Sequence, residues 1–341
     1  GSRVYATGTC GFLGVVQSLS TARWSGENAH SSLESFTDDE VANGARPRFL
    51  ATASIYAAYA TRLLGEAMCE GSVNGGPILS RPELWALAES KFTAGLAEAQ
   101  AAGEPELADL ARVGRARTRL NLATNPAAFG GPVAGKAEEA VADAEAVTAG
   151  FRWNATFASA DIESWNRVFF MNRDRTNLSV EDDYWNLEVG GMPDPRVQLS
   201  FPTQPDGSPR TGFDGNTRLV YQSKYLDPAA PIALARWEEA RLIVAEVRGG
   251  QTAVDIINQL RTPLGLPAFS STDPAAIRAQ VIEERQRVLF LESHHLNDKI
   301  RFGLPFTPAA GTPYKLTGGG TYGSSTCFPF PDEERFSNPN T

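Results

Sequence analysis

Apolar residues in the first half of the chain recur every three to four positions, which is the spacing of one buried face of a helix. In residues 46–70 this stripe runs through Ile55, Tyr59 and Leu63. The next segment opens with Ser80 and Glu83 in the pattern of a capping box and then keeps one apolar face. Gly, Pro and Asn separate the segments. Helices are therefore predicted over residues 46–70, 80–103, 105–123 and 133–149.

These helices have alanine at many predicted contact positions. Successive helices of this kind, joined by short breaks, are typical of antiparallel pairs of the tetratricopeptide type. The run Gly130 to Lys136 has the spacing of a phosphate-binding loop, but Ala137 stands where that loop needs Ser or Thr, and no strand is predicted before it. We interpret this run as the start of a helix.

Residues 151–231 have a different pattern, with tryptophans, many Asn and Asp, and clusters of Pro and Gly between residues 192 and 215. Polarity alternates in residues 196–201 and 217–221, and the turn sequence Pro205-Asp-Gly-Ser-Pro209 lies between them. This pattern predicts a small β-hairpin inside a loop-rich insertion.

Helical spacing returns at residue 230, continues to 249, and resumes over residues 253–264. One long helix is predicted over Pro274–Phe302, because Asp273 suits its cap and Pro274 its first position. Residues 304–326 are rich in Gly and Pro and predict an exposed loop.

The totals narrow the class of protein. The chain has 341 residues and 42% hydrophobic content, enough for a substantial core in one large domain or two smaller ones. A net charge of −9 without a basic run argues against nucleic acid and anionic lipid as partners. No stretch approaches the roughly 20 apolar residues of a membrane span, and no signal-peptide pattern opens the chain. Any export signal is therefore expected outside these residues.

Three segments of the C-terminal third resemble the SusD/RagB family of outer-membrane nutrient-binding lipoproteins. The run from Glu284-Arg285 to Phe302-Gly303 resembles the family's Glu-Arg pair, its Glu-Gly-x-Arg-x-x-Asp element and its Arg-Phe end. Residues 239–261 resemble its Leu-x-x-Ala-Glu and Asn-x-x-Arg helix pair, and residues 328–340 resemble its Pro-x-Pro, Glu and Asn-Pro-Asn tail. The resemblance is firm from about residue 233 onward.

The chain departs from this signature at its centre. Ser293 stands where the family prefers Gly, and His294 and His295 stand near a usual Arg. The local helix packing is therefore where the chain is expected to differ from the family.

The resemblance implies a mainly α-helical, SusD-like fold in a single domain, with tetratricopeptide-type helical pairs and a loop-rich insertion. The expected parts are an N-terminal segment (1–45), helical-pair repeats (46–150), an insertion that faces the ligand (151–231) and C-terminal signature helices with a tail (232–341).

The resemblance also implies a function. A family member would sit at the outer-membrane surface, bind an oligosaccharide or peptide, and act with a SusC-like TonB-dependent β-barrel. It would be held to the membrane only by an N-terminal lipid anchor, which is expected to lie outside this chain. Cys10 is the N-terminal candidate for that anchor, but the residues before it lack a lipoprotein pattern. The alternative is a structural or assembly role in an extracellular complex.

The signature region carries more carboxylates and guanidinium groups than solubility requires, Glu284 among them. The resemblance implies that they form buried ion pairs, and an acid–base site is the alternative. The expected structural cluster comprises Glu246, Arg285, Glu292, Asp298 and Arg301.

The resemblance implies an exported protein, which meets an oxidising environment. We therefore predict a disulfide between Cys69 and Cys327 that ties the tail to the N-terminal helices. Two buried free thiols are the alternative.

The aromatic residues of the middle region are the candidate ligand-binding groups, because sugar rings pack their apolar faces on Trp and Tyr. Nearby amides and carboxylates such as Asn166, Asp183 and Asn186 could bond the sugar hydroxyls. Core packing is the alternative for each aromatic residue. The candidates are Trp165, Tyr184 and Trp185 first, then Trp153 and Tyr221.

No pattern in the sequence indicates catalysis, and neither a cofactor nor a metal is expected. The chain has no Gly-x-Ser-x-Gly element. His295 and Asp298 share a helix face and could hold a metal, and residues 181–185 could supply oxygen ligands to calcium. We prefer a structural role for His295 and Asp298, and we interpret residues 181–185 as a solvated loop.

Overall fold

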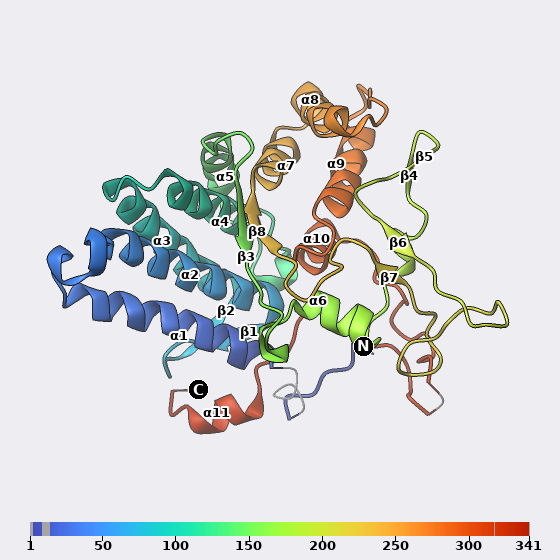
Figure 1. Ribbon diagram of the computed structural model, residues 1–341, viewed down its shortest axis with the longest axis horizontal. Helices are drawn as coiled ribbons and strands as arrows, with labels where there is room; N and C mark the ends of the chain where they lie inside the picture. Colours follow the sequence, from blue (N-terminus) through green and yellow to red (C-terminus); the bar gives the residue numbers. More distant parts are fainter. Residues whose placement is uncertain (1–2, 9–13, 317, 341) are drawn as a thin grey trace.

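The structure, a computed structural model, describes residues 3–8, 14–316 and 318–340 (Figure 1). Cys10 lies outside the described residues.

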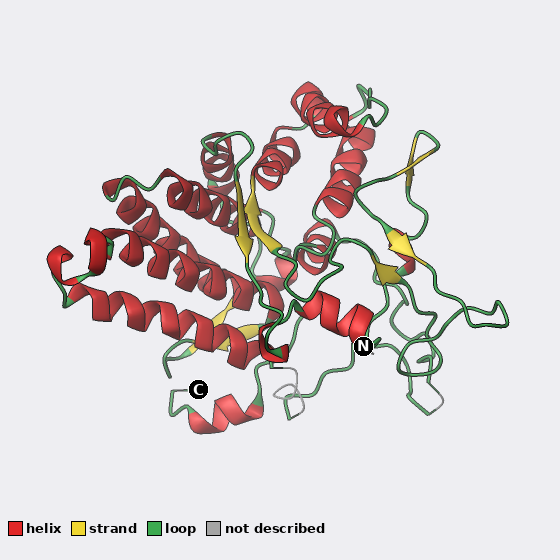
Figure 2. Cartoon of the chain, in the orientation of Figure 1, coloured by secondary structure: helices red, strands yellow, loops and turns green. Residues whose placement is uncertain are grey.

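Helices dominate, and the strands are short (Figure 2), which confirms the predicted mainly α-helical fold. The helices are α1 (Val15–Glu34), α2 (Arg46–Ala67), α3 (Arg81–Ala101), α4 (Pro105–Ala123), α5 (Lys136–Glu145), α6 (Arg167–Phe169), α7 (Trp237–Arg248), α8 (Gly250–Arg261), α9 (Pro274–Val288), α10 (His295–Phe302) and α11 (Asp332–Ser337). The strands are β1 (Glu70–Ser72), β2 (Ile78–Ser80), β3 (Arg152–Ala155), β4 (Glu188–Val189), β5 (Met192–Pro193), β6 (Leu199–Ser200), β7 (Tyr221–Gln222) and β8 (Ile232–Arg236).

Helices α2 to α5 form the predicted antiparallel array, and α1 extends it, so that each helix packs on the next along the chain (Figure 1). Small residues allow the close approach: a Cβ at Gly114 would come within 2.3 Å of the Phe92 ring, so this crossing requires glycine. Helix α1 was not predicted from the sequence. Arg23 is its only buried residue, so its apolar stripe is weak.

One core runs through α2 to α5, α7 to α9 and β8, and it joins the N-terminal helices to the C-terminal ones. Figure 1 shows α7, α8 and α9 continuing the array beyond α5. Because this core is continuous, the signature helices are fixed relative to the N-terminal array.

Two predictions about helix limits were wrong. Ile232–Arg236 is not helical, because it pairs as β8 with β3, and the helix begins only at Trp237. The long helix expected over Pro274–Phe302 is two helices, since α9 stops at Val288 and α10 starts at His295.

The C-terminal tail returns to the N-terminal helices. Cys69 and Cys327, which are 258 positions apart in the sequence, form the disulfide expected from the sequence. The Cys69 N–H donates to the Phe328 carbonyl at 2.9 Å, and the Asn338 amide donates to the β1–β2 hairpin at Gly76 O. The tail therefore closes the chain onto α2 and its hairpin.

The segment between β3 and β8 is loop-rich, as predicted. Its β6 and β7 pair antiparallel, which confirms the predicted hairpin, although the paired strands are only 2 residues long. A second, smaller core holds this segment against the chain just after α9, and its buried members are Val180, Tyr184, Val197, Val220 and Phe290.

Candidate functional site

A cavity of about 150 Å³ opens where the loop-rich segment meets α9 and α10. We call it the signature cavity, because most of its lining comes from the C-terminal signature. Its lining residues are Asp183, Tyr184, Ile282, Arg285, Gln286, Leu289, His294, His295, Asp298, Lys299, Leu304 and Pro305.

The break between α9 and α10 creates this cavity. Leu291 and Ser293 have positive φ angles of 59° and 63°, a left-handed conformation that glycine adopts most easily. This explains the Gly preference that the resemblance assigns to position 293, where this chain has serine. Since the chain turns here, His294 is directed into the core and His295 toward the loop-rich segment.

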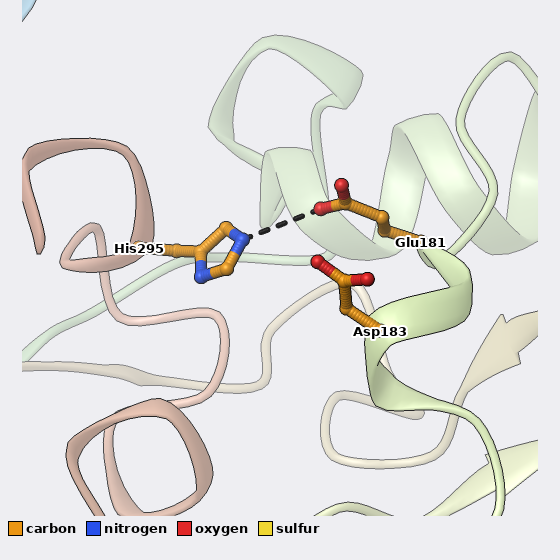
Figure 3. Close-up of side chains that lie close together, drawn as sticks. All are labelled: Glu181, Asp183 and His295. Atoms are coloured by element: carbon orange, nitrogen blue, oxygen red, sulfur yellow. Dashed lines mark hydrogen bonds and ion pairs between the residues drawn. The ribbon is translucent and has the colours of Figure 1, made fainter. Parts of the chain in front are cut away.

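His295 joins the two halves of the cavity. Its Nδ1 lies 2.9 Å from the Tyr184 hydroxyl. Its Nε2 lies 3.3 Å from Glu181 Oε2, the contact dashed in Figure 3. Glu181, Asp183 and His295 bring one ligand atom each within 4.8 Å of one another, close enough for a metal ion. The Lys299 ammonium already lies 3.0 Å from both carboxylates, so the cluster contains its own cation. The metal grouping considered from the sequence, His295 with Asp298, does not form, because Asp298 binds arginines instead.

The environment of the loop carboxylates favours ion pairing. Burial would raise the pKa of Glu181, but hydrogen bonds from His295 and Lys299 outweigh it and lower that pKa. Burial raises the pKa of the Tyr184 hydroxyl, which therefore stays protonated. The cavity wall therefore offers both neutral and charged hydrogen-bonding groups. Neither the lowered pKa of Glu181 nor the raised pKa of Tyr184 by itself indicates a reaction.

Four of the five residues of the expected ion-pair cluster form one network below the cavity. Arg285 donates to both oxygens of Asp298 at 3.0 Å, and Arg301 bridges Asp298 and Glu246 at 2.7 and 2.6 Å. Burial would raise the pKa of Asp298, but the two guanidinium groups lower it to about 2. Such a network fixes the packing of α7, α9 and α10.

The fifth residue of that cluster, Glu292, lies elsewhere. It pairs with Lys224 and Arg236 at 2.6 and 2.8 Å, and so ties the loop-rich segment and β8 to the turn after α9. Glu284 forms a third group with Arg196 and Arg261. The signature charges are therefore separate sets of ion pairs, each joining different elements.

A further buried network was missed in the sequence. Arg117 of α4 donates to both oxygens of Glu66 of α2, at 2.9 and 2.7 Å, and to the Ser293 carbonyl. Its Nη1 lies 2.9 Å from His294 Nε2, and burial lowers the pKa of His294 well below its usual value. The available signal was charged residues placed within the apolar stripes of α2 and α4.

The five candidate aromatic residues do not form one site. Tyr184 is 5% exposed and packs on Phe290, so its ring offers no face for stacking on a sugar. Trp185 is half-buried, with Arg218 over its ring. Tyr221 lies under Arg173 in the same part of the chain.

Trp153 lies in β3, and Trp165 lies near the start of the segment that follows this strand. The Trp153 indole donates to the Tyr56 hydroxyl of α2 at 3.0 Å, and its ring packs on the main core. The Trp165 indole donates to Ser159 O at 3.2 Å, and its ring meets Phe169 and Phe170 edge to face. Trp165 thus belongs to an aromatic group of its own, the Trp165 group (Trp165, Phe169 and Phe170).

The polar residues expected to bond sugar hydroxyls differ in availability. Asn166 is buried, and its side chain caps α6 and donates to Ala230 O, so it is committed to the fold. Asp183 is exposed and lines the signature cavity, while Asn186 is exposed with a φ of 51°. Only the last two keep groups at the surface.

No protein-family model matches the chain, and no curated protein matches it either. Solved structures do. A SusD superfamily protein from Parabacteroides distasonis superposes with a TM-score of 0.66 at 14% identity, over 99% of this chain and 86% of that chain. A SusD-like carbohydrate binding protein from Bacteroides vulgatus gives 0.56 at 15% identity, over 88% and 78% of the two chains. A surface glycan-binding protein A from Bacteroides uniformis gives 0.58 at 12% identity, over 95% and 84%.

Among the described residues, no helix is long and apolar enough to cross a membrane. The superposition with the Parabacteroides distasonis protein covers almost the whole of this chain. The protein has the SusD-like fold, as the resemblance of its C-terminal third implied.

Proposed function

We propose that the protein binds a glycan at the cell surface and passes it to a TonB-dependent β-barrel of the SusC type. One observation carries this proposal: the fold matches, over most of both chains, solved proteins whose names state carbohydrate or surface glycan binding. In this proposal the protein binds its ligand without chemical change, and a lipid anchor outside the described residues holds it at the outer membrane.

The loop-rich segment is the proposed recognition surface. It carries half-buried tryptophans whose indoles are already hydrogen-bonded, so little side-chain freedom is lost when a sugar stacks on them. The signature cavity adds donors and acceptors beside it, from His295, Lys299 and Asp183. An aromatic surface with a few polar groups is the chemistry that selects a sugar ring. A peptide is the second ligand class, which the same surface could bind.

A glycan panel tests this proposal, with calorimetry on each hit. Trp165→Ala removes the ring at the centre of the Trp165 group and is expected to weaken binding about tenfold or more. Trp185→Ala tests the other aromatic group in the same way. Trp24→Ala is the matched control, because Trp24 is 54% exposed on α1, outside the loop-rich segment. Equal loss with the control variant, or binding of peptides alone, would contradict the glycan proposal.

Purification from gently solubilised outer membrane tests the partner. Recovery of a large β-barrel in near-equal amount is the expected result. Self-assembly, or other surface proteins in its place, would instead support a structural role in an extracellular complex.

A further inference from the structure

A second cavity, of about 410 Å³, lies beside the signature cavity and shares Ile282 with it. We call it the α8 cavity, because it opens at the start of that helix. It is lined by Ala123, Thr124, Ala137, Ala245, Glu246, Val247, Gly249, Gly250, Pro274, Ile277, Arg278, Val281, Ile282, Arg301 and Phe302. Most of its wall is apolar, with the polar groups gathered at few points.

The charged residues that line this cavity, Glu246, Arg278 and Arg301, carry one more positive than negative charge. Glu246 has both oxygens engaged by Arg301, at 2.6 and 3.2 Å. Arg278 is exposed, stacks over the Phe302 ring at 5.4 Å, and forms no ion pair with any described residue. One positive charge therefore remains at the cavity.

Arg301 supplies a second observation. Its side chain is 1% exposed. Like Arg278, it stacks over the Phe302 ring, at 4.7 Å from the ring centroid. Its two Nη atoms are engaged by Glu246, Asp298 and Thr124, but its Nε–H has no hydrogen-bond partner in the part of the chain that the structure describes. An unpaired buried donor of a charged group is costly, and Arg301 is one of the residues that line the cavity.

The start of α8 adds further donors. Its cap is Gly249, which has no side chain to accept hydrogen bonds, and the first intrahelical bond of the turn is made by the Ala253 N–H to Gly249 O. Among the described residues, the N–H groups of Gly250, Gln251 and Thr252 have no backbone acceptor at this positive end of the helix, whereas the Gly249 N–H donates to Ala245 O. This arrangement favours an anion.

We propose that the α8 cavity binds a small monocarboxylate with an apolar body. The carboxylate would lie between Arg278 and the start of α8, and the apolar body would pack on Ile277, Val281 and Ile282 of α9. A single unpaired guanidinium matches one negative charge rather than two. The apolar wall distinguishes this ligand from a neutral glycan, so the site is separate from the proposed glycan surface.

Calorimetric titration with octanoate tests the site, with 1-octanol and octylammonium as matched probes. Octanoate is expected to bind, and the two other probes to bind at least tenfold more weakly, since they lack the negative charge. Equal affinity for octanoate and octanol, or no octanoate binding at millimolar concentration, would overturn the proposal.

Two variants locate the site. Arg278→Gln is expected to weaken octanoate binding about tenfold, because it removes a charge-assisted contact. Arg210→Gln changes an exposed arginine of the loop-rich segment and is expected to leave the affinity unchanged. Ala137→Trp fills the cavity without changing its charge and should abolish binding. Retention of full affinity by both cavity variants would contradict the assignment, whether or not the protein binds glycans.

Discussion

The helical frame (residues 15–155 and 232–302) and the loop-rich segment (residues 156–231) are stabilised in different ways. The frame has one continuous core and buried ion networks that join helices far apart in the chain. The loop-rich segment has strands of 2 residues and is held by side chains that bond the backbone, such as Asn166, Asn172 and Gln222. A segment of this kind can change its surface while the frame keeps its shape, which suits a protein that must recognise a particular ligand.

The largest expected effect of a single substitution lies in the frame. Arg117→Met leaves the Glu66 carboxylate buried without its main partner, so the free energy of unfolding should fall by about 3–5 kcal/mol. Urea unfolding measures this change. Arg210→Met in the loop-rich segment is the control, and its effect should stay below about 0.5 kcal/mol. Similar losses in the two variants would contradict the difference between the regions.

Removal of the disulfide should have the next largest effect. Cys69→Ser together with Cys327→Ser opens a loop of 258 residues and should lower the free energy of unfolding by about 2–4 kcal/mol. Because the tail covers the β1–β2 hairpin, proteolysis should begin at the tail in this variant and not in the loop-rich segment. Peptide mapping that finds Cys69 as a free thiol in the native protein would refute the bridge itself.

A local substitution should sharpen the comparison. Asn172→Ala removes the amide that donates to Leu178 O and Val220 O and accepts from the Gln222 N–H. The expected loss is about 1–3 kcal/mol, because buried backbone groups are left unpaired. Hydrogen exchange should accelerate around residues 172–222 and stay unchanged in α2 to α4. Uniform acceleration through both regions would show that the segment is not independent.

The smallest predicted effect concerns pH. His294 is buried and its pKa is lowered well below 6.5, so the unfolded chain binds a proton that the folded chain does not. Stability is therefore present above pH 6.5 and falls as the pH drops below it, approaching about 1.4 kcal/mol per pH unit. His294→Asn should flatten this fall in chemical unfolding between pH 6.5 and 5, and His30→Asn on α1 should not. The Asp298 carboxyl, with its pKa lowered to about 2, stabilises the fold above about pH 4, and this stabilisation is lost as the pH falls from about 4 to 2.

Apolar spacing predicted α2 to α5 and the mainly helical fold, because the apolar residues of those helices pack in the core. It could not show where α9 ends, since Val288, Leu289 and Leu296 continue a helical pattern and neither Gly nor Pro marks the turn. Strand β8 was also hidden, because Ile232–Arg236 is extended only through pairing with β3, far away in the sequence.

The candidate site was predictable in composition but not in arrangement. The signature charges were expected to be buried, yet the partners of Glu292 and Arg117 come from distant elements that no local pattern links to them. The aromatic residues were found by type alone. Which of them is buried, as Tyr184 is, depends on a second core formed by residues about 100 positions apart.

The most direct test of the central claim is hydrogen–deuterium exchange with and without a glycan identified in the panel. The expected result is protection within residues 156–231 and at the rim of the signature cavity around His295, with no change in α1 to α5. Protection confined to the helical frame, with the loop-rich segment unchanged, would contradict the proposal that this segment recognises the ligand.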